Sequence, residues 1–132
     1  MTVTTVNLRS NAKESGNALP KRSMDAYKVT MDGDTDTGWI NKEFLAILTL
    51  GIPARHAGLT AKIYGRYKLN GTPDAATETL ISEKDGTDKV LALDTHASEG
   101  STFVIDEAAP FDQVKAVISG AMTGVLLFGF GA

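Results

Sequence analysis

The sequence predicts an all-β protein, and three observations carry this prediction. Short segments of alternating or continuous apolar residues recur along the 132-residue chain, separated by Gly, Asn and Asp turn signals. The pattern lacks the long amphipathic helices that a parallel α/β sheet requires. Hydrophobic residues make up 42% of the chain, which is enough for one buried core. We therefore expect a single antiparallel β-sandwich or jelly roll of about eight strands with an extended N-terminal arm.

Residues 1–22 are the expected arm, flexible or extended, and residues 23–132 the expected sandwich domain. Residues 3–8 alternate in polarity, so they could add a strand to a neighbour's sheet, with a disordered tail as the alternative. Four basic residues against one acidic residue give the arm a charge of +3 and leave −6 for the other 110 residues. The arm residues expected to contact another protein surface are Val6, Leu8, Arg9, Lys13, Lys21 and Arg22.

The expected strands follow the arm in order. They are residues 26–31, 46–52, 60–69, 79–82, 89–93, 101–105, 113–119 and 123–130. The pair Asn70-Gly71 is the strongest turn signal, because both residues tolerate the positive φ of a tight hairpin turn. Residues 83–88 predict a polar hairpin loop, and residues 120–124 a glycine-marked turn between the last two strands. The helix candidates are residues 41–48 and residues 73–78.

Composition excludes several classes of site. The chain has no cysteine, which rules out disulfides and thiolate metal sites, and its net charge of −3 is too mild to indicate a nucleic-acid partner. The start lacks a signal-peptide pattern. The most apolar stretches, residues 44–53 and 117–132, are too short or too rich in glycine for a membrane span. We expect a soluble protein without cofactor and without direct nucleic-acid or membrane contacts.

The sequence offers little catalytic chemistry. His56 and His96 are the only histidines. Asp94 and Glu99 lie near His96, but that segment is typical of a strand end followed by a polar loop. Glycine motifs that cradle phosphate are missing. We therefore expect a protein that is not an enzyme.

The sharpest local pattern is an acidic run with calcium-loop spacing. Counting from Asp32, the oxygen-bearing residues Asp34, Asp36 and Glu43 fall at positions three, five and twelve. Thr37 stands where such a loop needs glycine, and the flanks are typical of strands rather than helices. We prefer an ordinary polar loop as the explanation of the run, because Asp stabilises turns through its own backbone. The run is a candidate metal site and no more.

Trp39, the single tryptophan, and the closing strand are candidate contact residues. We expect Trp39 to fill one end of the core. The alternative is sugar stacking by Trp39 with Tyr64 and Tyr67, although two tyrosines three apart on a strand face opposite sides. Residues 125–130 are apolar on both faces, so something besides the core must cover them. The candidate subunit contacts in this strand are Leu126, Phe128 and Phe130.

Three stretches together resemble a known class of proteins. They are the tryptophan and apolar strand of residues 39–50, the alternating strand of residues 60–70, and the ending of residues 110–131. That ending has the order Phe-Asp, strand, Ser-Gly, Thr-Gly, strand, Gly. It resembles the small β-sandwich virion proteins of tailed bacteriophages, including head decoration or cement proteins. The resemblance spans residues 39–131.

The resemblance implies structural work. Such proteins bind over joints between capsid subunits, often as trimers, and reinforce the shell. It thus implies a virion protein made in the host cytoplasm, with the major capsid protein or other virion subunits as partners. It also implies a homo-oligomer, with a trimer favoured. The alternative is a carbohydrate- or receptor-binding module of a phage tail or fibre.

Overall fold

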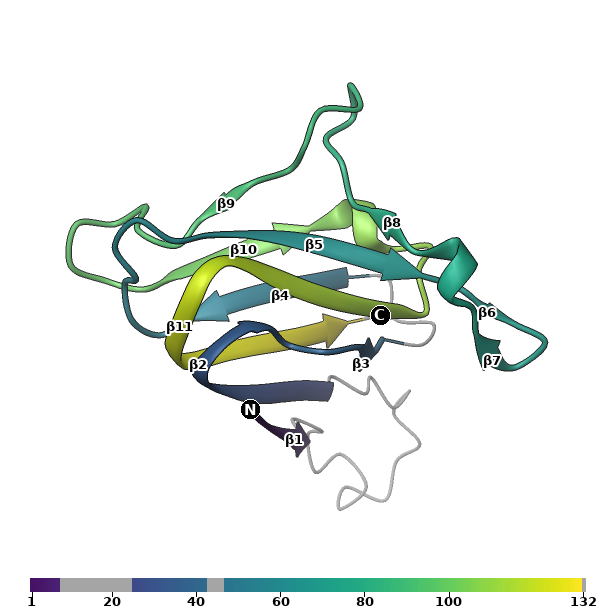
Figure 1. Cartoon of the computed structure of the whole chain (residues 1–132), viewed down its shortest axis with the longest axis horizontal. Coiled ribbons are helices and arrows are strands. Elements are labelled where there is room, and N and C mark those ends of the chain that lie inside the picture. Colours follow the sequence, from purple (N-terminus) through teal and green to yellow (C-terminus); the bar gives the residue numbers. More distant parts are fainter. Residues whose placement is uncertain (8–24, 43–46, 132) are drawn as a thin grey trace, which may run out of the picture.

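The computed structural model describes residues 1–7, 25–42 and 47–131, and over these ranges the chain is all-β, as predicted (Figure 1). Two 3-10 turns, η2 (Ala75–Thr77) and η3 (Asp106–Ala108), join strands. The strands are β1 (Thr2–Asn7), β2 (Asp25–Asp36), β3 (Ile40–Asn41), β4 (Ile47–Ile52), β5 (Thr60–Arg66), β6 (Lys68–Leu69), β7 (Thr72–Pro73), β8 (Thr79–Leu80), β9 (Leu91–Ala92), β10 (Ser101–Ile105) and β11 (Gln113–Gly131).

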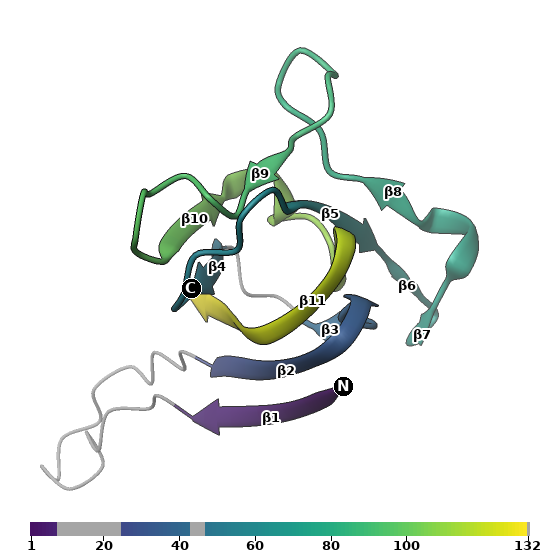
Figure 2. The same ribbon diagram turned by 60° about the vertical axis from the view of Figure 1, so that its left-hand side comes forward.

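Nine of the strands form one large antiparallel sheet that folds over a single core, and β6 and β7 form a separate two-stranded sheet (Figure 2). One layer has the order β1-β2-β11-β4-β10. The other layer contains β5, which pairs with the beginning of β11 on one side and with β8 and β9 on the other. The short β3 also pairs with the beginning of β11. Strand β11 therefore belongs to both layers and joins them.

The turn predicted at residues 120–124 is wrong, because β11 runs through it as one bent strand. The register between β11 and β2 shifts between Val117 and Met122, and again before Thr123. Gly124 has a φ of +150°, a conformation that side chains with a Cβ rarely adopt. Glycine has no Cβ and adopts backbone conformations that other residues rarely adopt, so it suits a β-bulge as well as a turn. The bend carries β11 from one layer into the other (Figure 2).

The core lies between the layers and takes side chains from both parts of β11. Val114 and Ala116 from its beginning are fully buried, as are Leu126 and Phe128 from its end. Phe130 is 1% exposed and packs edge-on against Tyr27, with ring centroids 5.5 Å apart. The predicted subunit contact of Leu126, Phe128 and Phe130 is therefore wrong, because these side chains are enclosed within their own chain.

The other predicted turns and helices have mixed outcomes. Asn70 and Gly71 form the predicted turn, with φ of 53° and 79°, although it joins the separate small hairpin β6–β7. Residues 83–88 form the predicted hairpin loop, which an antiparallel bridge between Ser82 and Asp88 closes, although the strands β8 and β9 themselves both pair with β5. Residues 73–78 contain only the short η2, which Asp74 caps. Of the other helix candidate, residues 43–46 lie outside the described residues.

The N-terminal segment corrects the predicted arm. Strand β1 pairs with β2 of its own chain, whereas the sequence allowed it either to join a neighbour's sheet or to be a disordered tail. An edge strand satisfies its backbone groups on whichever sheet edge is nearest, and β2 supplies that edge. Residues 8–24 lie outside the described part. So do the side chain of Val6 and the predicted contact residues Leu8, Arg9, Lys13, Lys21 and Arg22.

Lys42 follows β3 and fixes the point where β11 begins. Its side chain is 1% exposed, and its Nζ donates to the carbonyl oxygens of Ala109 at 3.0 Å and Phe111 at 2.9 Å. Its backbone N–H donates to the backbone carbonyl oxygen of Asp112 at 2.8 Å. Burial lowers the pKa of Lys42, and the charge of Asp112 opposes that shift. A buried cation thus holds the segment that enters β11.

Candidate functional site

On the outer surface of the β2–β11–β4–β10 layer, the stretch where all four strands pair carries little charge. The strand register places its outward residues in two rows across the sheet. They are Lys28, Leu127, Gly51 and Thr102 in one row, and Ala26, Gly129, Thr49 and Val104 in the next. We call these eight residues the smooth face. Its two large apolar side chains, Leu127 and Val104, are 38% and 57% exposed.

A shallow open hollow borders the smooth face. Its volume is about 400 Å³, and it is lined by Gly51, Ile52, Pro53, His96, Gly100, Ser101, Thr102 and Leu127. His96 is exposed, and the nearby Asp94 carboxylate accepts from the backbone N–H of Gly58 at 3.0 Å. The Ser101 hydroxyl is buried and has no hydrogen-bond partner among the described residues. The hollow adds relief to an otherwise flat sheet surface.

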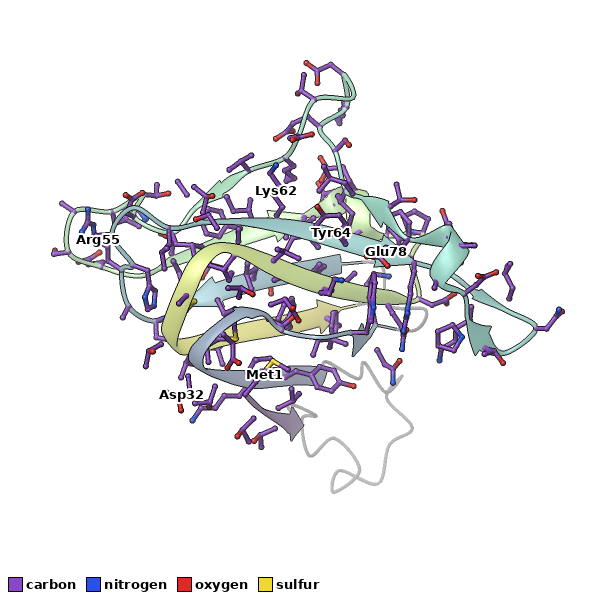
Figure 3. The ribbon with its side chains drawn as sticks, viewed as in Figure 1. Met1, Asp32, Arg55, Lys62, Tyr64 and Glu78 are labelled. Carbon is purple, nitrogen blue, oxygen red and sulfur yellow. The ribbon has the colours of Figure 1, made fainter. Side chains whose placement is uncertain are left out.

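A second surface lies on the layer of β5, β3 and the beginning of β11. We call it the Trp39 patch, and it consists of Trp39, Asn41, Tyr64, Arg66, Glu78, Gln113 and Lys115. The register pairs Tyr64 of β5 with Lys115 of β11, and Arg66 with Gln113. Figure 3 shows Tyr64 on β5 and Glu78 beside the η2 turn. The patch therefore gathers aromatic, amide and charged groups from four segments.

Trp39 lies at the centre of this patch and not at the end of the core, so the preferred prediction for it is wrong. Its side chain is half-buried. The Arg66 Cζ lies 4.2 Å and the Lys115 Nζ 4.7 Å from its ring centroid. Trp39 comes after the long β2, and its side chain does not enter the core. The next residue, Ile40, takes the inward position instead and is 3% exposed. Two cations of the same chain therefore lie against the indole ring that was the candidate for sugar stacking.

Hydrogen bonds order the polar part of the patch. The Arg66 Nε donates to the Gln113 Oε1 at 2.7 Å, and the Gln113 Nε2 donates to the Asn41 Oδ1. Gln113 is only 8% exposed, so its amide is held almost entirely by these partners. The Lys115 Nζ lies 3.2 Å from the Glu78 Oε1. Three adjacent strands thus fix the position of one guanidinium group.

The remaining candidates lie elsewhere. Tyr67 packs on Phe111, with ring centroids 5.0 Å apart, and is separate from the Trp39 patch. His56 packs beside Gly124 at the bend of β11. Among the described residues no three His, Asp or Glu side chains gather in a group that could hold a metal ion.

The acidic run of the calcium candidate lies within β2 and not in a loop. Asp34 Oδ2 accepts from the backbone N–H of Asp32 at 2.9 Å, which lowers the pKa of Asp34. Asp36 Oδ1 accepts from the backbone N–H of Gly38 at 2.8 Å. These two carboxylates hold backbone N–H groups, as Asp residues do near strand ends and bulges. The fourth candidate ligand, Glu43, lies outside the described residues.

No family model matches the sequence, and no curated protein is significantly similar to it. Over the described ranges, no helix is long and apolar enough to cross a membrane. Function must therefore be inferred from the two surfaces.

The sequence did not reveal the smooth face, and of the Trp39 patch it indicated only Trp39 and Tyr64 as candidate contact residues. The smooth face could have been found by counting charges at the outward positions of the strands, where Gly, Ala and Thr replace the usual Lys and Glu. The Trp39 patch had a signal in Lys62, Tyr64 and Arg66, which alternate along one strand and so share one side.

Proposed function

We propose that this chain is a structural protein of a virion, which binds over joints between shell subunits and reinforces them. The observation that supports the proposal best is the smooth face. An antiparallel sheet with one side in water normally carries polar and charged residues on that side. Here eight neighbouring outward positions include a single charge, that of Lys28. Such a surface suits contact with another protein chain.

The smooth face has the composition of an interface centre. The cores of protein interfaces are depleted in charged residues, and their rims are polar. Leu127 and Val104 stand up from a floor of Gly, Ala and Thr, so they are the side chains that a partner would bury. The likeness of residues 39–131 to phage decoration proteins points to a shell subunit as that partner, with three copies of this chain around each joint.

The proposal is tested by adding the purified chain to particles isolated from cells that produce it and stripped of their own copies. We expect the wild-type chain to sediment with the particles. Leu127→Asp should weaken this association by about tenfold or more, because it places a charge at the interface centre. The matched control is Leu69→Asp, since Leu69 is 52% exposed on β6 and lies outside the smooth face. Equal sedimentation of the two variants would contradict the proposal.

The alternative, a carbohydrate- or receptor-binding module, gains less from the structure. A sugar ring that stacks on Trp39 would have to displace Arg66 or Lys115 from the indole. We therefore place the virion role first. A glycan array probed with the full chain tests the alternative, and we expect no binding that depends on Trp39.

A further inference from the structure

We infer that the Trp39 patch is a binding site for a carboxylate on an acidic segment of a partner protein, with Arg66 as the group that receives it. This inference rests on the proposed function, because it names the chemistry of a contact made by the assembled chain. The smooth face would supply apolar contact area, and the Trp39 patch a directional charged contact. The patch lies on the other layer of the sheet, so it is a separate contact.

Arg66 is held in place before any ligand arrives. Its guanidinium lies 4.2 Å from the centroid of Trp39, and its Nε is bonded to Gln113 at 2.7 Å. Gln113 is in turn held by Asn41 and is almost fully buried. A side chain fixed in this way loses little conformational entropy on binding, which is the main cost of ordering a free arginine.

The charge of Arg66 is also unpaired within the described part of the chain. No carboxylate of the described residues lies within 4.0 Å of it, whereas Lys115 is paired with Glu78 at 3.2 Å. An arginine has five N–H donors, and the described residues accept from only the Nε of Arg66. The patch keeps a net positive charge beside an aromatic ring. Its donors match the two oxygens of a carboxylate.

The residue types of the Trp39 patch favour a protein as the source of the carboxylate. Tryptophan, tyrosine and arginine are the residue types that dominate binding energy at protein interfaces, and Trp39, Tyr64 and Arg66 lie together here. An acidic sugar would stack its ring on an aromatic face, and at Trp39 Arg66 and Lys115 already lie 4.2 and 4.7 Å from the ring centroid. The geometry therefore favours an Asp or Glu side chain of a protein over a uronic acid.

The single tryptophan provides the readout, because the emission of Trp39 reports on its own binding site. The full-length chain is titrated with a blocked (Gly-Glu)4 peptide and, separately, with the matched (Gly-Gln)4 peptide. Trp39 emission and isothermal calorimetry are recorded together. We expect a saturable response to the Glu peptide and none to the Gln peptide.

Variants of Arg66 sharpen the test. Arg66→Gln should weaken binding of the Glu peptide by about tenfold or more, and Arg66→Lys should also weaken it because a lysine cannot bind both carboxylate oxygens at once. Lys62→Gln is the matched control. Lys62 lies on the same side of β5 and pairs with Asp88 at 3.0 Å, outside the patch, so its loss should leave the affinity within about twofold. Circular dichroism confirms that each variant is folded.

Three results would overturn the inference: no response to the Glu peptide, an equal response in Arg66→Gln, or binding of hyaluronan in place of the peptide. The last result would assign the patch to acidic sugars. Failure of the inference is distinguishable from failure of the proposed function, since the peptide is tested on the isolated chain and particle binding by sedimentation. A chain that binds particles but not the Glu peptide would lose only the inference.

Discussion

The two halves of β11 face the same core but present opposite outer surfaces. In residues 113–119 the inward side chains Val114 and Ala116 are buried, and the outward ones include Gln113 and Lys115. In residues 125–131 the inward side chains are buried as well, but the outward positions carry Val, Leu and Gly. One strand thus contributes a polar patch to one layer and an uncharged face to the other. The difference separates the residues that folding needs from those that we propose for contact with a partner.

The second half of β11 also shows how a continuous apolar run in a sequence should be interpreted. Residues 125–130 look apolar throughout, but only every second side chain enters the core. Leu126 and Phe128 are fully buried in the core and are needed for folding. Leu127 lies between them on the outer side of the strand and is 38% exposed. The outward member of such a run is the residue that indicates a partner.

The largest expected effect is at an inward position of the second half. Phe128→Ala should lower the free energy of unfolding by about 3–5 kcal/mol, because the fully buried ring leaves a cavity. Urea denaturation measures the change. Leu127→Ala, one residue earlier and outward, should cost about 1 kcal/mol or less. Similar losses for the two variants would remove the distinction between the inner and outer sides of this half.

The next effect concerns the entry to the first half. Lys42→Met should destabilise the chain by about 2–4 kcal/mol, since the carbonyls of Ala109 and Phe111 lose a charged donor. The pKa of Lys42 is lower in the folded chain than its ordinary value of 10.5, so the unfolded chain binds more protons between those two values.

The contribution of Lys42 to stability should therefore rise with pH in that window and be constant below it. Urea melts of wild type and Lys42→Met, run at several alkaline pH values, measure the difference. A gap between the two proteins that narrows as the pH rises through the window would contradict the assignment.

A smaller effect is expected at the bend between the halves. Gly124→Ala should cost about 1–3 kcal/mol, because φ is +150° and the new Cβ would come within 2.8 Å of the His56 Cε1. Gly120→Ala is the control, with a contact of 3.3 Å to the flexible Leu59 side chain and no positive φ. Thermal melting compares them, and a bend that tolerates both substitutions equally would show that Gly124 is not needed for it.

The smallest effect is expected on the outer side of the first half. Lys115→Gln removes an ion pair with Glu78 and a contact with Trp39, both partly exposed, and should cost about 1 kcal/mol or less. The loss should shrink further in high salt, which screens exposed charges. Denaturation at two salt concentrations checks this. A loss that is large and independent of salt would mean that the Trp39 patch is part of the folding core.

Local signals in the sequence predicted part of this structure. Alternating strands, the lack of helical periodicity and the Asn70-Gly71 turn all depend on a few neighbouring residues, and the structure confirms them. The continuity of β11 could not be predicted in the same way, because whether Gly124 turns or bends the chain depends on pairing with the distant β2. The position of Trp39 likewise depends on Arg66 and Lys115, which only the sheet register brings beside it.

The candidate sites were harder to predict than the fold, for a physical reason. A binding surface is a set of outward positions on several strands, and its members meet only through register. Gly51, Leu127 and Thr102 form one row of the smooth face although they are far apart in sequence. Each of them alone is an unremarkable strand residue.

The most direct test of the central claim is electron cryomicroscopy of particles purified from cells that produce this chain. We expect density for the chain over joints between shell subunits, with Leu127 and Val104 buried against a neighbouring protein. Particles that lack the chain, or that carry it with the smooth face open to solvent, would contradict the claim.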